Sequence, residues 1–424
     1  MRRIALRHGG FLALGRRSAA TLVCIASFLL FLTSCANAQT DSAGTRPYAR
    51  MNREGVSYSG PGREAAYDLP GDLVTIGMIL PLSGPRAAEG KELLEAARMA
   101  VEEESATPLP GGHRLVLAAG DENGAWGRAS SEIVRLVMED RAVALVTSED
   151  GEIAHEAEQV ATKIGVPVLT LASDATTTEI NLPWIFRLGP SDAEEARAFA
   201  EHIYRQQGFQ KVLLAVQADH DGRAGSEEFE KAARRLGAPV PERLDIRGAA
   251  AEWGALLALK SQAPEAIVVW TDAENAAKLL SMAGEGQSLP AIYLSRKASG
   301  YAAGEAEAGC ASSTPGAENQ AGIWVSAPRG ARTCGAKQAF ARRFRALTGS
   351  EPGSVAESAY DAVRIIAAAV RRAGPNRARL RDQLVSGAGF KGVSGSIAFD
   401  SAGNERGDIA VVRLQAARGA AAEF

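Results

Sequence analysis

The sequence predicts an α/β fold made of two doubly wound parallel-sheet lobes. Apolar runs with strand character alternate with helical patterns in two successive sets of similar size. Such alternation indicates parallel sheets with right-handed crossovers. The length of 424 residues is enough for two or three domains. Glycine is abundant and aromatic residues make up only 6%, which favours helix-rich α/β packing over an aromatic-rich β-sandwich.

The first set of elements begins with the apolar run LVTIGMIL at residues 73–80, which ends before Pro81 and fits a strand buried on both faces. Apolar residues at helical spacing, such as Leu93 and Ala97, then predict a helix. In chain order the set comprises a strand at 73–80, a helix at 88–104, a strand at 114–119, a helix at 129–140, a strand at 142–147, a helix at 152–164 and a strand at 166–171.

The second set follows Pro190 and repeats the alternation. It comprises helix 192–207, strand 211–216, helix 224–237, strand 240–246, helix 251–261, strand 265–270, helix 273–284 and strand 290–294, then a short strand at 323–325, helices 335–348, 354–373 and 376–386, and a hairpin-like segment at 392–414. Ligands of such sheets bind at the carboxyl ends of the strands. Two lobes that face each other therefore predict a cleft that closes around a ligand.

The N-terminus has the features of an export signal. Residues 19–32 are almost continuously apolar and too few for an ordinary membrane span. The sequence Leu32-Thr33-Ser34-Cys35 resembles a bacterial lipobox, which implies a signal peptide at 1–34 and lipid attachment to Cys35. The alternative is an ordinary signal peptide cleaved near residues 36–38, with Cys35 discarded. Residues 35–71 are polar and predict a flexible tether.

The charge of the exported part is acidic. The whole chain has a net charge of -3, and the first 35 residues carry five arginines and no acidic residue. Removal of those five positive charges leaves -8 for the rest. Nucleic-acid binding requires a basic surface, so this function class is excluded.

Two cysteines lie beyond the leader, Cys310 and Cys334. An even pair in an exported chain predicts a disulfide, and two unpaired thiols are the alternative. Neither cysteine has a C-x-x-C partner or nearby histidines, so a zinc site at these residues is not expected.

Four segments, taken in order, resemble a known family. They read IGMILPLSGP at 76–85, GVPVLT at 165–170, FRLGPSD at 186–192 and GVSGSIAFD at 392–400. Over about residues 72–414 the chain resembles type I periplasmic binding proteins, the leucine/isoleucine/valine-binding class of ABC-transporter receptors. The resemblance implies three hinge crossings near 188–192, 325–329 and 391–395. It implies lobe one at 72–190 with 327–391, lobe two at 191–326 with 392–414, and a tail at 415–424.

The same resemblance implies the ligand-binding positions. Family receptors for amino acids bind the ligand carboxylate with hydroxyl and N–H groups and the ammonium with an acid. The residues that fall on these positions or face the same predicted cleft are Ser83, Glu89, Ser148, Asp174 (or Thr176, if two residues are inserted), Asp221 and Arg296. Several depart from the family pattern, because acids stand where a ligand carboxylate would bind and would repel it. The departures argue against ordinary leucine or valine capture. A cationic, hydroxyl-rich or oligomeric ligand remains open, as does a pocket that instead binds a partner.

No catalytic motif is present in the sequence, and an enzyme is not expected. No cofactor is expected. Asp219-His220-Asp221 is the one compact group that could touch a metal. Adjacent residues rarely supply a full coordination shell, so a surface loop is the expected structure and no metal site is predicted.

These observations together predict a lipid-anchored solute receptor. The resemblance implies that its partners are a small-molecule ligand and an ABC-transporter permease. Its body would lie in the periplasm or otherwise outside the cytoplasmic membrane, held by the lipid anchor. The alternative is an envelope lipoprotein that uses the same fold to sense a ligand or to regulate a partner enzyme.

Overall fold

The computed structural model describes residues 62, 72–123, 127–179, 182–247, 264–282, 290–300, 322–329, 334–393 and 395–414. Several predictions fall outside these residues: the signal peptide, Cys35, nearly all of the tether, the helix at 251–261, Cys310 and the tail. Cys334 is the first residue of a helix, α13 (Cys334–Thr348). Within the described residues, no helix combines the length and the apolar character that crossing a membrane would require.

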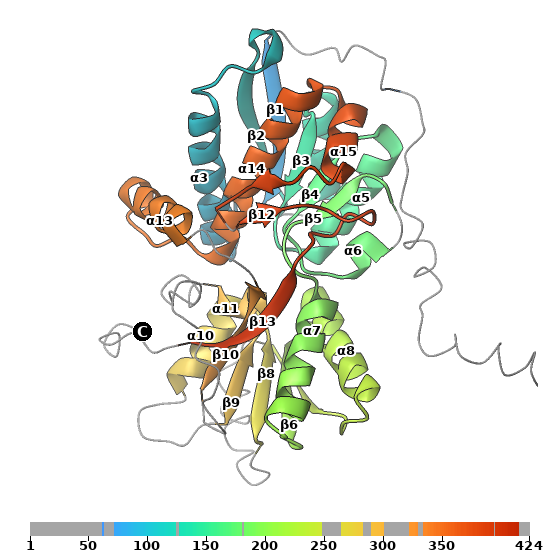
Figure 1. The fold of residues 1–424 in the computed structure, drawn as a ribbon, viewed down its shortest axis with the longest axis vertical. Helices are drawn as coiled ribbons and strands as arrows, with labels where there is room; N and C mark the ends of the chain where they lie inside the picture. Colours follow the sequence, from blue (N-terminus) through green and yellow to red (C-terminus); the bar gives the residue numbers. More distant parts are fainter. Residues whose placement is uncertain are drawn as a thin grey trace, which may run out of the picture. The chain divides into compact units, whose positions relative to one another are not determined.

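The first sheet is fully parallel and has the strand order β2-β1-β3-β4-β5 (Figure 1). Its strands are β1 (Leu73–Leu80), β2 (Arg114–Asp121), β3 (Ala144–Thr147), β4 (Val168–Thr170) and β5 (Ile185–Arg187). The connecting helices are α3 (Ala87–Glu104), α4 (Arg128–Met138), α5 (Gly151–Ile164) and the short α6 (Thr176–Glu179), with a 3₁₀ turn at Pro110–Gly112. The continuous apolar run of β1 is buried as predicted, because helices cover both faces of the sheet.

The second sheet has the order β13-β10-β9-β8-β6-β7. Its strands are β6 (Val212–Gln217), β7 (Glu242–Ile246), β8 (Ala266–Trp270), β9 (Ala291–Leu294), β10 (Ile323–Arg329) and β13 (Asp408–Arg413). The helices are α7 (Asp192–Ala200), which continues as the π-helical segment η2 (Glu201–Gln206), then α8 (His220–Arg235), α10 (Ala273–Met282) and α11 (Arg296–Ser299). Two parallel-sheet α/β lobes are thus confirmed, with β13 as an antiparallel strand at the edge of the second sheet.

The C-terminal helices return to the first lobe. α13 is followed by α14 (Ser354–Ala373) and α15 (Arg377–Val385), and their apolar residues belong to the core of β1 and α3. α14 lies alongside α3 (Figure 1). The first lobe therefore combines residues from two distant parts of the chain.

The passages between the lobes differ in detail from the predicted crossings. β10 pairs with β13 as far as Arg329, so the second sheet extends beyond residue 327, where lobe one was expected to resume. Residues 390–393 and 395–399, which include β11 (Phe390–Lys391) and β12 (Ser396–Ile397), stay with the first lobe because Ile397 and Phe399 are buried in its core. The ring of Phe399 packs edge-on against Phe186 with centroids 5.4 Å apart. The chain then reaches the second sheet at Asp408, later than the predicted passage at 391–395.

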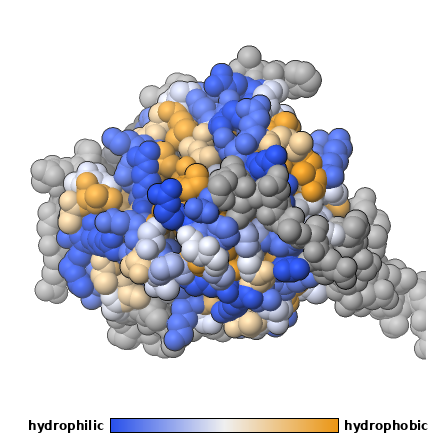
Figure 2. Space-filling view, turned by 90° about the horizontal axis from the view of Figure 1, so that it is seen from above, coloured by the Kyte–Doolittle hydropathy of each residue, from blue (hydrophilic) through white to orange (hydrophobic). Residues whose placement is uncertain are grey.

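Hydrophobic residues occur in small patches among hydrophilic ones on the face shown in Figure 2. The large apolar side chains that are exposed in the described residues are separate in sequence: Val134, Met138, Ile164, Val240 and Leu347. Val134 and Met138 are neighbours, one turn apart in α4, and the other three are single. Exposed apolar residues in such small numbers are normal on protein surfaces. The polar contacts between the lobes are therefore the more informative feature.

Candidate functional site

Two hydrogen bonds join the strand ends of the first lobe to those of the second. The backbone N–H of Gly151, at the start of α5, donates to Asp221 Oδ1 at 3.1 Å. His220 Nε2, at the start of α8, lies 2.8 Å from Asp174 Oδ2 in the loop after β4. These residues follow the carboxyl ends of β3, β4 and β6, which is where a doubly wound sheet places its ligand.

Both helices at this contact have capped N-termini that fix their first turns. Asp150 accepts a hydrogen bond from the Glu152 N–H at 2.9 Å, and Asp219 accepts one from the Gly222 N–H at 2.8 Å. Gly151 also allows close approach. A Cβ at that position would lie 2.7 Å from Asp221 Oδ1 and 3.1 Å from Asp174 Cβ. A side chain at Gly151 would therefore displace the Asp221 carboxylate from its contact with lobe one.

Lobe one contains a charged network made of Arg86, Glu89, Glu122 and Asp150. The Arg86 guanidinium contacts Glu89 at 2.7 Å, Asp150 at 2.9 Å and Glu122 at 3.3 Å. Burial raises the pKa of Glu122 to about 7, although the charge of Arg86 acts in the opposite direction. One arginine thus holds three carboxylates at the edge of the lobe-one sheet.

Glu149 lies between this network and the basic residues of lobe two. It is 9% exposed, and its burial raises its pKa to about 7. The positive charges of Arg296 and Lys297 lower that pKa, and the negative charge of Glu89 raises it. Glu149 is therefore only partly ionised at pH 7, and charged residues of both lobes influence its ionisation.

A second group, the lobe-two pocket, is strongly acidic. We define it by Asp192, Glu195, Asp219, Asp221, Asp272 and Lys297; Ser173 and Trp270 also line it. Its cavity volume is about 10 Å³, which is about the space that one water molecule occupies. A solute could enter only if side chains or lobes moved apart.

Lys297 is the cation of the lobe-two pocket. Its Nζ lies 2.5 Å from Asp221 Oδ2. Burial is the largest single influence and would lower the pKa of Lys297, but the charge of Asp221, its hydrogen bond and the charge of Asp219 together outweigh burial and raise the pKa. Lys297 is therefore charged and paired with Asp221.

Asp192 and Glu195 remain with weaker compensation in the lobe-two pocket. Asp192 is 2% exposed; burial, together with the charge of Glu195, raises its pKa to about 8. Its Oδ2 atom is buried without a hydrogen-bond partner among the described residues. Burial raises the pKa of Glu195 to about 7, although Glu195 accepts hydrogen bonds from Ser326 Oγ and from the Arg296 N–H. A buried carboxyl oxygen that lacks a partner in a pocket indicates a place for a donor from outside the chain.

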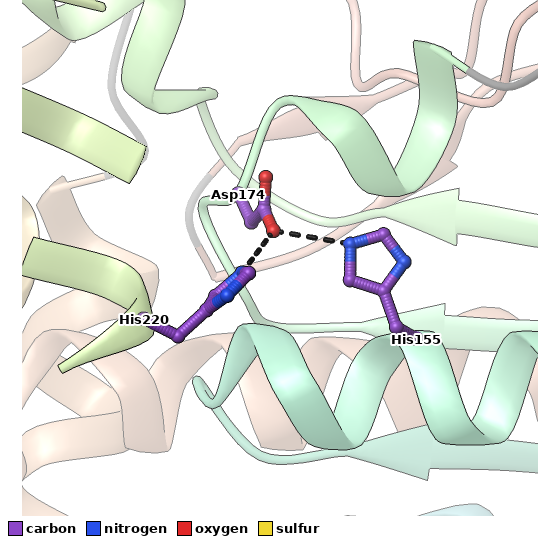
Figure 3. A group of neighbouring side chains, drawn as sticks. All are labelled: His155, Asp174 and His220. Carbon is purple, nitrogen blue, oxygen red and sulfur yellow. Dashed lines mark hydrogen bonds and ion pairs between the residues drawn. The ribbon is translucent and has the colours of Figure 1, made fainter. Parts of the chain in front are cut away.

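His155, Asp174 and His220 form a third group (Figure 3). Asp174 Oδ2 lies 3.1 Å from His155 Nε2 and 2.8 Å from His220 Nε2. Hydrogen bonds to Asp174 and Glu158 raise the pKa of His155 to about 9. Burial would raise the pKa of Asp174, but hydrogen bonds from the two histidines and Thr176 hold it well below its usual range.

The structure brings several of the sequence-predicted residues to this region. Asp174 and Asp221 both converge on Gly151, and Thr176 donates its hydroxyl to Asp174 Oδ1 at 2.7 Å. Glu89 belongs to the lobe-one network. Arg296 extends from lobe two to donate to the Leu188 carbonyl at 3.2 Å and to Ser358 Oγ at 3.1 Å.

Two predicted residues make other contacts. Ser148 is fully buried, and its Oγ accepts a hydrogen bond from the Asp150 N–H at 3.3 Å. Ser83 is exposed, and its N–H donates to Asp121 Oδ1 at 3.3 Å, next to Asn123. Ser148 therefore stabilises the loop between β3 and α5, while Ser83 contacts the C-terminal end of β2.

Sequence reasoning missed Arg86, Glu149, His155, Asp192 and Glu195. Asp192 and Glu195 stand in the first turn of α7, where acids also serve to stabilise the helix N-terminus, so their pattern is ambiguous. His155 is inside a helix and lacks any motif partner nearby in sequence. Only the fold brings it to Asp174 and His220.

Comparison with known proteins identifies the family. A family model described as periplasmic binding protein matches residues 73–420. One curated relative is the Leu/Ile/Val-binding protein homolog 3 of Brucella melitensis, 27% identical over 167 residues. The match covers 39% of this chain and 45% of that relative.

Solved structures share the fold at low sequence identity. A branched-chain amino acid transporter substrate binding protein from Streptococcus pneumoniae, in complex with isoleucine, has a TM-score of 0.65 at 22% identity. The alignment covers 80% of this chain and 99% of that one. A solute binding protein of an ABC transporter from Rhodopseudomonas palustris BisB5, in complex with 3,4-dihydroxy benzoic acid, has a TM-score of 0.69 at 17% identity, covering 82% and 94%. These two ligands differ widely in chemistry, so the fold leaves the choice of ligand to the site.

Proposed function

This chain belongs to the periplasmic binding protein family, and we propose that it is an extracytoplasmic receptor that delivers a polar solute to an ABC transporter. The family match over residues 73–420 and the shared fold support this role. The lobes meet through polar residues at the strand ends, as a receptor that closes around its ligand requires.

The lobe-two pocket indicates the class of solute. Asp192 Oδ2 is buried without a partner among the described residues, and this observation carries the proposal. An ammonium or a hydroxyl group of a solute would donate to it and remove the cost of an unpaired buried acceptor. Lys297 is already paired with Asp221, which leaves less positive charge for a free carboxylate. An amino-acid-like or other solute with amine or hydroxyl donors fits best.

The test begins with thermal unfolding of the purified protein in the presence of amines, polyols and amino acids. A ligand at 100 times its dissociation constant should stabilise the protein by about 2.7 kcal/mol. Calorimetric titration then compares the wild type with Asp192→Asn and Asp221→Ala. Both changes should weaken binding by roughly 10- to 150-fold, because a cationic donor would hold Asp192 ionised, and a hydrogen bond to a charged group is worth about 1.5–3 kcal/mol.

Asp245→Asn is the matched control, since Asp245 is an exposed acid of lobe two that pairs with Arg243. Its affinity should equal that of the wild type. Unchanged affinity in Asp192→Asn and Asp221→Ala would place the ligand elsewhere. Tight leucine binding that ignores both changes would overturn the charge argument.

We further propose that residues 1–34 are a signal peptide and that Cys35 carries the lipid anchor, on the strength of Leu32-Thr33-Ser34-Cys35. Cys35→Ala should release the protein from the membrane fraction or leave an unprocessed precursor. Unchanged fractionation and unchanged mass would refute the anchor.

A disulfide between Cys310 and Cys334 is a separate proposal, supported by the even pair of cysteines beyond the leader. The unreduced, denatured protein should contain no free thiol from these two residues. Two free thiols would refute the bond.

One observation favours a second candidate function. The lobe-two pocket has a volume of only about 10 Å³, which would suit an envelope protein that binds a partner rather than a solute. That candidate gains support if no compound in the solute panel changes the unfolding temperature while the protein still associates with a partner at the envelope.

A further inference from the structure

The cluster of His155, Asp174 and His220 is not among the residues that line the lobe-two pocket (Figure 3). One coordinating atom from each of the three lies within 4.8 Å of the other two. Two imidazoles and a carboxylate are ligands that zinc and neighbouring transition metals accept in proteins. We propose that these three residues bind a divalent transition metal, with zinc as the best fit, at the contact between the lobes.

The spacing around Asp174 suits such a site. In a tetrahedral zinc site with bonds of about 2.0–2.1 Å, ligand atoms lie about 3.3 Å from one another. Asp174 Oδ2 lies 3.1 Å from His155 Nε2 and 2.8 Å from His220 Nε2. The two imidazoles are 28% and 33% exposed, so small side-chain rotations can adjust the remaining spacing between their nitrogens.

Surrounding hydrogen bonds orient the coordinating atoms. Glu158 Oε2 lies 3.1 Å from His155 Nδ1, which directs the Nε2 lone pair of the imidazole to the cluster. The backbone N–H and the hydroxyl of Thr176 both donate to Asp174 Oδ1, at 2.9 and 2.7 Å. Outer partners of this kind typically accompany metal sites in proteins. A metal would take the place of the hydrogen bonds that Asp174 Oδ2 makes with the two histidines and of the 2.9 Å contact between His155 Nε2 and Thr176 Oγ1.

The ligands come from both lobes. His155 is in α5 and Asp174 follows β4, whereas His220 opens α8 on the other side of the contact. A metal bound by all three would be held fully only when the lobes are together. By linkage, the metal should favour the closed arrangement to the extent that it binds that arrangement more tightly. Three protein ligands would also leave one coordination position for water or a solute group.

The experiment is calorimetric titration of the purified full chain, first stripped with a chelator, with Zn²⁺, and with Co²⁺ as a visible-absorption probe. One equivalent should bind, with a Co²⁺ spectrum typical of tetrahedral coordination. His155→Gln and His220→Gln should each weaken binding at least about 100-fold, because even an outer partner is worth about 10- to 100-fold. Glu158→Gln should fall within that smaller range.

His113→Gln is the matched control, because it removes a histidine outside the cluster and should bind metal as the wild type does. Small-angle X-ray scattering gives a second measurement: Zn²⁺ should reduce the radius of gyration of the wild type and of His113→Gln, but not that of His220→Gln. Circular dichroism checks that each variant is folded, and His155→Gln provides a second site if His220→Gln is not.

Equal Zn²⁺ affinity in the wild type, His155→Gln and His220→Gln would overturn the proposal, as would the absence of stoichiometric binding to the wild type. In either case the cluster would be a hydrogen-bonded ion pair between the lobes and nothing more. The metal measurement stands apart from solute transport, so its failure would leave the proposed receptor function intact, and the reverse also holds.

Discussion

Both lobes bring acidic side chains to their shared contact, but they compensate them differently. In lobe one, the Arg86 guanidinium contacts three carboxylates, all of which belong to the same lobe. In lobe two, five acids surround a single lysine, and the Oδ2 atom of Asp192 lacks a partner among the described residues. Each carboxylate of the lobe-one network therefore already has a contact with a cation, whereas Asp192 in lobe two has none in the described part of the chain that reaches its Oδ2 atom. The difference teaches that ligand choice in this protein should depend mainly on lobe two.

The strand-to-helix geometry is nevertheless the same in both lobes. Gly90 in the first turn of α3 lies so close to the end of β1 that a Cβ would be 2.1 Å from the Pro81 carbonyl oxygen. Gly222 in the first turn of α8 has the same relation to β6, with a Cβ 2.2 Å from the Gln217 carbonyl oxygen. Both lobes thus use a glycine in the first helical turn to bring the helix close to the end of the preceding strand. They differ in the charged side chains that lie near these strand ends.

The largest effect on the comparison should come from Lys297→Met. The side chains of Lys297 and Asp221 are 16% and 13% exposed, and removal of the lysine leaves Asp221 with the Gly151 N–H but no cation. We expect the free energy of unfolding to fall by about 2–4 kcal/mol, somewhat less than for a completely buried pair. Urea denaturation at pH 7 measures it.

Lys278→Met is the matched control, because Lys278 forms an exposed pair with Glu274 at 2.7 Å. Its effect should stay within about 0.5 kcal/mol. If both lysine changes had equally small effects, the acids of lobe two would be compensated by something other than Lys297, and the contrast between the lobes would disappear.

An intermediate effect should come from Gly90→Ala and Gly222→Ala, which test what the lobes share. Each new methyl group would collide with a backbone oxygen, so each change should lower the free energy of unfolding by about 1–3 kcal/mol. Gly335→Ala, where a Cβ meets nothing within 4 Å, should be neutral or slightly stabilising. Thermal unfolding measures these effects. Strongly unequal effects of Gly90→Ala and Gly222→Ala would contradict the idea that both lobes depend on the same close approach of a glycine to a carbonyl oxygen.

The smallest effect should come from Glu195→Gln, and it depends on pH. The pKa of Glu195 is about 7 in the folded protein, above its usual 4.5. Between pH 4.5 and 7 the folded state therefore keeps a proton that the unfolded state has released, and this contribution to stability is lost as the pH rises.

The difference between pKa values of 4.5 and 7 corresponds to at most about 3 kcal/mol at pH 8, and relaxation around the buried charge lowers this. Glu195→Gln should consequently be more stable than the wild type by about 1–2 kcal/mol at pH 8, because glutamine carries no charge to bury. At pH 4.5 the two proteins should be nearly equal. Denaturation at both pH values measures the difference. A stability difference that did not change with pH would show that burial does not raise the pKa of Glu195 in the folded protein.

Long, periodic elements could be predicted from the sequence, and very short ones could not. The apolar run of β1 and the helical spacing in α3 are strong local signals, and both elements lie where expected. β5, α6 and α11 have three or four residues each, too few to show a period. The antiparallel pairing of β13 depends on β10, which lies far away in sequence.

The candidate site was predictable only in part for the same reason. Asp174 and Asp221 follow strands at positions that the family fold places together, so their convergence could be expected. The position of His155 beside them depends on how α5 packs against the start of α8. The unpaired oxygen of Asp192 depends on burial, which no local sequence pattern reports.

The position of β13 has a consequence for how the chain folds. During synthesis, the free edge of β10 remains unpaired until residues 408–413 have been made. The core around β1 likewise waits for α13, α14 and α15, which follow the whole of the second sheet apart from β13. Contacts between such distant segments slow folding and leave strand edges exposed to wrong pairing in the meantime. Lobe two cannot complete its sheet before β13 has been made, and lobe one cannot complete its core before Phe399 has been made, so late contacts should limit the rate at which both lobes mature.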